Sequence, residues 1–156
     1  MMTYLIVAVA VYGLALLLIS MLSTAPQDLG VRQGRLAACP DSPNCISTFA
    51  DSDDSVHYLA AVSYRGDSGE LLEKIKSYMK SHERALVKKE SELYLYFECR
   101  TLLCRYIDDV EVYLDEKEHL IHLRSASRLG HSDLGANRRR LESLLKAVSS
   151  FTEFSQ

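Results

Sequence analysis

Residues 92–100, ELYLYFECR, decide the fold of this chain. Apolar side chains at positions 93, 95, 97 and 99 alternate with tyrosine and glutamate. A period of two is typical of a strand that turns one face to a hydrophobic core. Residues 85–89 lie directly upstream and also have strand character. The two segments are therefore predicted to form a β-hairpin.

Further strands are predicted on both sides of this hairpin. Residues 109–115 place Val110, Val112 and Leu114 on one face. The charged sequence Glu-Lys-Glu at 116–118 then predicts a turn into another strand over residues 119–125. Upstream, residues 57–65, HYLAAVSYR, predict one more strand.

Two helices are predicted around these strands. Asp67 can cap the first, with Glu70 three residues later, and an apolar stripe follows at positions 71, 72, 75, 78 and 79. Ser132 or Asp133 can cap the second, whose stripe carries leucine or valine at positions 134, 141, 144, 145 and 148.

The order strand, helix, four strands, helix predicts an α+β domain over residues 37–150, with a tail at 151–156. We expect a mostly antiparallel sheet of about five strands with both helices on one face, because each helix must bury one apolar stripe. The domain is long enough for one hydrophobic core and too short for two.

The N-terminal residues predict a membrane anchor. Residues 3–22 contain no charged side chain, and about twenty helical residues span the roughly 30 Å hydrocarbon core. We therefore expect a transmembrane helix within residues 1–22, followed by a polar linker over 23–36. A cleaved signal peptide is the alternative, but no lysine or arginine precedes the apolar run and Pro26 follows the possible cleavage site. Lipidation at Cys39 would lie too far beyond the run.

Charge and cysteine content bear on location and partners. The net charge of −3 supplies no basic face, so nucleic-acid binding is not expected.

Arg32 and Arg35 after the apolar run favour a cytoplasmic domain. Four cysteines in two close pairs favour an oxidising compartment instead. We expect a single-pass protein of the bacterial cell envelope whose domain lies on the extracytoplasmic (periplasmic) side.

Cys39 and Cys45 admit three interpretations, of which a disulfide closing the loop CPDSPNC is favoured. A zinc site usually has two to four residues between paired cysteines, and here there are five. A thiol nucleophile would need an activating base, and the sequence points to none. No metal and no cofactor is expected.

Two polar residues interrupt the apolar stripe of the last helix, Asn137 and Arg138. A core-facing arginine is costly unless it is paired and hydrogen-bonded. Asp108 and Asp109, on the strand that this helix should cover, are its expected partners. Arg139 and Arg140 are expected to point toward solvent. The segment before the helix adds more polar side chains to this cluster, namely Arg124, Ser127, Arg128 and Asp133. The cluster is either an internal salt-bridge network or a pocket for an anionic ligand.

Several short motifs along the domain resemble one protein family. They are CPDSPNC at 39–45, Arg-Thr at 100–101, DDVE at 108–111, RSASR at 124–128 and DLGANRRR at 133–140. Together they resemble the uncharacterised family DUF1499, in this order, over about residues 36–148. The resemblance implies no activity, cofactor or substrate. Cys104 stands where an apolar residue is expected in that family, so a bond between Cys99 and Cys104 would be particular to this chain.

The function expected from these residues is binding, of either a small anionic ligand or a protein partner. None of the common catalytic motifs of serine hydrolases, P-loop proteins, zinc proteases or dinucleotide-binding enzymes is present. A hydrolase or transferase that uses the Asp/Arg cluster is the alternative, and a purely structural or assembly role is the second. A concave pocket with converging groups would favour an enzyme, whereas arginines that are all paired would favour a scaffold.

Overall fold

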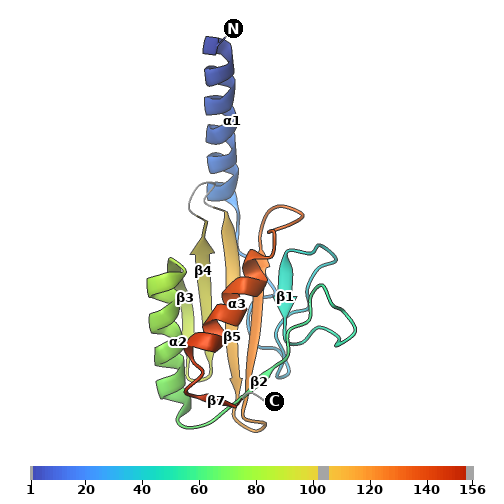
Figure 1. Cartoon of the computed structure of the whole chain (residues 1–156), viewed down its shortest axis with the longest axis vertical. Coiled ribbons are helices and arrows are strands. Elements are labelled where there is room, and N and C mark those ends of the chain that lie inside the picture. The colour runs from blue at the N-terminus through green and yellow to red at the C-terminus, as the bar shows by residue number, and fades with distance from the viewer. Residues whose placement is uncertain (1, 102–105, 154–156) are drawn as a thin grey trace.

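The computed structural model describes residues 2–101 and 106–153 and has a mixed α+β fold (Figure 1). All paired strands are antiparallel and belong to one sheet, in the order β3-β4-β5-β6-β2-β7, with β1 pairing to β6 off this path. The elements are α1 (Met2–Leu22), β1 (Cys45–Ser47), β2 (Val62–Tyr64), α2 (Ser68–His82), β3 (Ala85–Ser91), β4 (Tyr94–Arg100), β5 (Ile107–Asp115), β6 (Leu120–Ser127), α3 (Ala136–Ala147) and β7 (Thr152–Glu153).

The predicted count of about five strands is wrong, because the described residues form a seven-stranded sheet. The additional strands are β1, with three residues, and β7, with two. Segments this short show no period of two, so the sequence pattern could not indicate them. The predicted strand over residues 57–65 is also shorter, since only Val62–Tyr64 pair within the sheet.

The transmembrane helix is the second correction. Crossing a membrane takes about twenty sufficiently apolar helical residues in succession. Among the residues that the structure describes, no helix meets the length and apolarity needed for a span. The helix α1 itself forms over the expected residues and extends away from the sheet (Figure 1).

Helices α2 and α3 cover one face of the sheet, as predicted (Figure 1). Alternate residues of the central strands point toward them, and Phe97, Val110 and Leu123 are fully buried there. The cap of α2 is as expected, because the Asp67 carboxylate accepts a hydrogen bond of 2.8 Å from the Glu70 amide. We call this side of the sheet the helix face.

The start of α3 differs from the prediction and changes which residues face the core. Gly135, with a φ of 77°, precedes the first helical residue, and Leu134 has a φ of 54° and is 86% exposed. Leu134 is therefore not part of the helix. The buried side of α3 includes Asn137 and Arg140, whereas Arg138 lies at its margin.

The segment before β1, together with Phe49 after it, covers part of the opposite side of the sheet, which we call the open face. Leu36 is buried against Tyr94 and Tyr96, and Leu29 and Phe49 pack on the same cluster. The Gly30 amide donates a 2.7 Å hydrogen bond to a carboxylate oxygen of buried Glu111. The segment expected to be a linker is therefore partly packed on the domain.

Candidate functional site

Adjacent residues of a strand point to opposite faces, so the polar cluster is divided between the two sides of the sheet. Asp108 faces the helices, whereas Asp109 and Glu111 face the open side. The same alternation on β6 sends Ser125 to the helix face and Arg124 to the open face. The result is two networks and not one.

The network on the helix face is complete in itself. Arg140 is 8% exposed, and its Nη2 donates to Asp108 at 2.8 Å while its Nε donates to Glu83 at 3.0 Å. Its Nη1 donates to the Asn137 side-chain oxygen at 2.7 Å and to the Ser125 hydroxyl at 3.1 Å. Every nitrogen of this guanidinium therefore has a protein partner.

Asn137 connects this network to the disulfide loop. Its amide nitrogen donates to the Asn44 carbonyl at 2.9 Å and to the Ser127 hydroxyl at 3.0 Å. The Ser127 hydroxyl in turn donates to Asp108 at 2.6 Å. These bonds tie α3, β5, β6 and the loop before β1 together, which is the geometry of a structural network.

On the open face, Arg128 is held as completely as Arg140. Its Nε donates to both carboxylate oxygens of Asp109, at 2.9 and 3.1 Å, and its Nη2 bonds to Glu98 at 2.6 Å and to the Tyr96 hydroxyl at 2.8 Å. Its Nη1 donates to the Ser23 carbonyl at 3.0 Å. Burial alone would raise the pKa of Glu98, but Arg128 outweighs that effect and lowers it.

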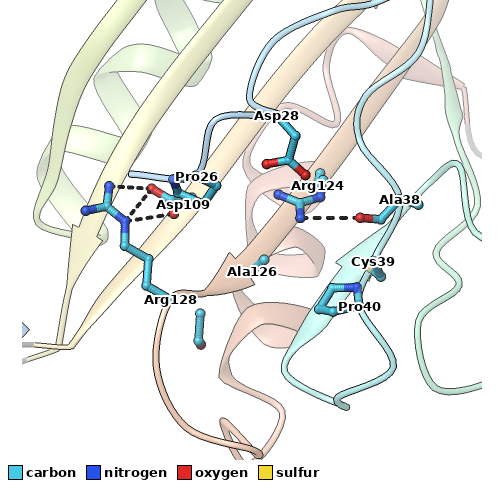
Figure 2. Close-up of a pocket in the computed structure, with 10 residues that line it drawn as sticks. Pro26, Asp28, Ala38, Cys39, Pro40, Asp109, Arg124, Ala126 and Arg128 are labelled. Carbon is cyan, nitrogen blue, oxygen red and sulfur yellow. Dashed lines mark hydrogen bonds and ion pairs between the residues drawn. The ribbon is translucent and has the colours of Figure 1, made fainter. Parts of the chain in front are cut away.

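A pocket of ≈ 370 Å³ lies on the open face, beside the Arg128–Asp109 pair (Figure 2). We call it the Arg124 pocket. Three parts of the chain form its walls: the segment before Gly30, the start of the disulfide loop, and strands β5 and β6 with the residue after β6. The lining residues are Pro26, Asp28, Ala38, Cys39, Pro40, Asp109, Arg124, Ala126, Ser127 and Arg128.

Arg124 differs from the other two arginines, because its hydrogen bonds are few and long. The residue is 4% exposed. Its Nη1 lies 3.3 Å from Glu111 and its Nη2 lies 3.5 Å from the Ala38 carbonyl, as Figure 2 shows for the latter. Its Nε is buried and has no hydrogen-bond partner among the described residues. A buried donor without a partner costs free energy. Two long contacts for a guanidinium with five N–H groups leave Arg124 capacity for a further acceptor.

Glu111, the ion-pair partner of Arg124, is fully buried and also accepts hydrogen bonds from other donors. One of its oxygens accepts from both the Gly30 amide and the Tyr94 hydroxyl at 2.7 Å, and the other faces Arg124. Burial and the neighbouring Glu111 raise the pKa of Tyr94 well above its usual value. Tyr94 therefore stays a neutral donor, and Glu111 is free to compensate the Arg124 charge.

The predicted disulfide between Cys39 and Cys45 is confirmed. It closes the loop whose first residues line the Arg124 pocket. Cys99 is a buried free thiol, and burial raises its pKa to about 12, so it is protonated at neutral pH and is no nucleophile. The possible partner of Cys99, Cys104, lies outside the described residues.

A second cavity of ≈ 250 Å³ lies on the other side of the disulfide loop and is lined in part by His57 and Asp54. His57 Nδ1 is 2.7 Å from the Asp54 carboxylate and Nε2 is 3.2 Å from the Ser42 carbonyl. Both partners are acceptors, so the doubly protonated ring satisfies both contacts. Burial alone would lower the pKa of His57, but these hydrogen bonds outweigh it and raise the pKa.

In the described residues, no group of three or more His, Cys, Asp or Glu side chains is arranged to hold a metal ion.

Six of the eight predicted site residues take part in the two networks. Asp109, Arg124 and Arg128 meet on the open face, and Asp108, Ser127 and Asn137 meet on the helix face. The other two lie elsewhere. Asp133 accepts from the amides of Gly135 and Asn137 at the start of α3, and Arg138 bonds to the carbonyls of Ser55, Val56 and Tyr58.

The sequence reasoning missed Glu111 and Asp28, and its expectation that Arg140 points toward solvent is wrong, because Arg140 is buried. Arg140 takes the place beside Asp108 that was expected for Arg138. The alternation along β5 could have indicated Glu111, which lies two residues after Asp109 and so must share its face. No local pattern marks Asp28, because its position depends on how residues 23–36 pack over the sheet.

Comparison with curated proteins and with solved structures found no match. A family model described as "Protein of unknown function (DUF1499)" matches residues 35–148, which include both networks, the disulfide loop and most of the lining of the Arg124 pocket. The match confirms the resemblance that the motifs indicated. The chain therefore belongs to the DUF1499 family.

Proposed function

We propose that this protein binds a small ligand in the Arg124 pocket, and that Arg124 holds a carboxylate or similar anionic group of the ligand. The observation that carries the proposal is the unpartnered Nε of a guanidinium that is 4% exposed. Arg128 and Arg140 have partners for all their nitrogens. Among the described residues, the Nε of Arg100 is also buried without a partner, but Arg100 does not line this pocket.

The size and walls of the pocket support a small ligand. Its volume of ≈ 370 Å³ lies at the lower end of the range of about 300–1,000 Å³ that is usual for ligand sites. The apolar residues Pro26, Ala38, Pro40 and Ala126 form much of its lining. Arg124 is fixed from below by Glu111, so little side-chain entropy would be lost when an anion binds.

The lining residues fit binding better than catalysis. Ser127 carries the one hydroxyl of the lining residues, and this hydroxyl donates a hydrogen bond to Asp108 on the other face of the sheet. Cys39 is in the disulfide. Asp109 is held by two contacts from the Nε of Arg128, and it also accepts from the Tyr96 hydroxyl at 2.6 Å. The one base paired with a lining hydroxyl is therefore Asp108, and its charge is already held by Arg140 at 2.8 Å.

The test measures the thermal midpoint of the full chain with acetate, butyrate, succinate and inorganic phosphate. At least one of these anions should raise the midpoint of the parent protein, because a ligand that binds only the folded state stabilises it. Arg124→Gln should abolish the shift. Arg139→Gln removes the same charge from an exposed position and should keep the shift.

Arg124→Gln leaves the buried Glu111 without its charge partner and could fail to fold. The double variant Arg124→Gln/Glu111→Gln removes both charges together and provides the second measurement. A shift of equal size in this double variant would overturn the proposal, as would the absence of any shift with all four anions in the parent.

A further inference from the structure

We infer that the ligand of the Arg124 pocket is a zwitterion, whose ammonium group is placed at Asp28 when its anionic group is placed at Arg124. This inference rests on the proposed function, since it takes Arg124 as the anchor of the anionic group. It adds the chemical class of the ligand and a second residue that determines specificity.

The charges around the pocket are the first argument. Two guanidinium groups and two carboxylates line it, from Arg124, Arg128, Asp28 and Asp109. Arg128 and Asp109 neutralise each other in direct contact, with Nη2 and a carboxylate oxygen 2.7 Å apart. Arg124 is paired with Glu111, which does not line the pocket, and Asp28 is the lining charge without a charged partner among the described residues.

Glu111 makes the site unfavourable for a simple anion. It lies 3.3 Å from Arg124 and already compensates its positive charge. A ligand with only a negative group would therefore gain the hydrogen bonds of Arg124 but meet the repulsion of Asp28 and Glu111. A zwitterion brings no net charge, and its positive group would turn the repulsion from Asp28 into attraction.

The position of Asp28 is the second argument. Its carboxylate is directed toward the guanidinium of Arg124 from another wall of the pocket (Figure 2). Asp28 is exposed and forms no ion pair with any of the described residues. The backbone beside it is held in place, because Leu29 packs on the open-face core and the Gly30 amide bonds to Glu111.

The lining also indicates which kind of cation fits. Quaternary ammonium groups are recognised by aromatic side chains that surround them. None of the ten lining residues of this pocket is aromatic, whereas a carboxylate accepts hydrogen bonds from a primary ammonium group. The ligand class is therefore a small amino acid and not a betaine.

The test compares ω-amino acids from glycine to 6-aminohexanoate with the unsubstituted carboxylates of the same length, by calorimetric titration of the full chain. At the best length, the amino acid should bind about two- to fivefold more tightly than its carboxylate, as expected for an exposed ion pair. The trimethylammonium analogue of that amino acid should lose this advantage.

Variants at Asp28 separate specificity from binding itself. Asp28→Asn should bring the amino acid and the carboxylate to equal affinity, and Asp28→Glu should keep part of the difference. Asp53→Asn makes the same charge change at an exposed position outside the lining and should leave both affinities unchanged.

The possible failures are distinguishable. If carboxylates bind in an Arg124-dependent way but amino acids gain nothing, the zwitterion inference is overturned and the proposed function stands. If Asp28→Asn strengthens both ligand series equally, Asp28 is an internal competitor and the inference is again overturned. If neither series binds, the proposed function itself has failed.

Discussion

Three consecutive arginines show how strongly the environment of one residue depends on helix phase. Arg140 lies in the helix-face network and Arg139 is exposed. Arg138 bonds to the backbone carbonyls of Ser55, Val56 and Tyr58. The composition of this stretch predicts none of these differences. They follow from the fact that α3 begins at Ala136 and places Asn137, Arg140 and Leu144 on one side.

The first prediction concerns Arg140. Arg140→Ala would leave Asp108 buried without its charge partner, which typically costs about 3–5 kcal/mol. The free energy of unfolding in urea, followed by tyrosine fluorescence, measures this loss. Arg139→Ala is the matched control and should stay within about 0.5 kcal/mol of the parent. Small and equal effects of the two substitutions would contradict the assignment.

The sequence predicted a buried arginine with an aspartate partner, and the structure has one, but at a different position. The prediction took Leu134 as part of the apolar stripe. This placed the centre of the buried face of the helix too close to Arg138. The backbone of Leu134 and Gly135 is left-handed, which no hydrophobic pattern records. A small rotation of the face was enough to exchange Arg138 for Arg140, because the two residues flank it on opposite sides at about 100° per residue.

The second prediction concerns His57 and pH. Because the pKa of His57 is raised in the folded protein, its contribution to stability is present below the ordinary value of about 6.5. This contribution is lost as the pH rises through the folded pKa. The stability difference between the parent and His57→Gln should therefore decrease from pH 6 to pH 8.5, measured by urea unfolding.

His122 supplies the opposite control. Burial lowers the pKa of His122, so its neutral form is favoured in the folded protein and stability falls as the pH drops below the ordinary value. Relative to His122→Gln, the parent should lose stability between pH 7 and pH 5. Slopes of the same sign for the two histidines would refute the assigned hydrogen bonds of His57.

Helices and strands were predicted correctly where the apolar residues follow a regular spacing along the sequence. The helix α2 has a side-chain cap and an unbroken apolar stripe, and both were predicted. The strands β3 to β6 were also placed to within a few residues. The strands β1 and β7 were missed because their pairing is fixed by distant residues, as between Cys45 and Ala126.

The third prediction concerns the disulfide loop. Among the described residues, the backbone of residues 37–41 makes one hydrogen bond, which the Ala38 carbonyl accepts from Arg124 at 3.5 Å. The disulfide is therefore the main constraint on this wall of the pocket. Reduction should lower the free energy of unfolding by about 2 kcal/mol, as estimated for so short a loop. Urea unfolding with and without a phosphine reductant measures the change.

Alkylation of the reduced protein gives the control for this measurement. Cys39 and Cys45 should react readily after reduction, whereas Cys99 should react slowly in the folded state, because it is 1% exposed and its pKa is raised. An unchanged unfolding midpoint in the reduced protein would show that the loop is held by contacts other than the disulfide.

At the scale of the whole molecule, the sheet is covered on both faces by different means. Helices α2 and α3 cover one face, and the irregular segment before β1 covers part of the other. The alternation of apolar residues along the strands predicted the layer of helices, but not the layer formed by the segment before β1. Residues 23–36 are rich in glycine and polar residues, which is typical of a linker. The few apolar residues of this segment show no spacing that would indicate packing.

This second layer explains why the sequence identified part of the site but not its shape. The cluster of Asp and Arg residues was found from the strands and the last helix. The pocket exists because residues 26–28 and the disulfide loop stand above Arg124, and those walls come from the segment that carried no signal. Site chemistry was thus predictable where it lay on regular elements, and unpredictable where it depended on the covering segment.

The fourth prediction tests whether residues 29–36 belong to the folded domain. Leu36 is 4% exposed and packs against Tyr94 and Tyr96, so Leu36→Ala should lower the free energy of unfolding by about 2–4 kcal/mol. Val31 lies in the same segment but is 36% exposed, and Val31→Ala should cost much less. Urea unfolding of the full chain measures both.

The same variant also connects packing to the pocket. Leu36 is followed directly by Ala37 and Ala38, and the Ala38 carbonyl accepts the bond from Arg124. Loss of the Leu36 side chain should therefore loosen the wall above Arg124. It should also accelerate hydrogen exchange of the Gly30 amide, which its bond to buried Glu111 is expected to protect in the parent. If Leu36→Ala matches Val31→Ala in stability and Gly30 exchanges rapidly in the parent, the segment is a linker after all. The Arg124 pocket would then lack one of its walls in solution, because Pro26 and Asp28 are positioned by the same segment.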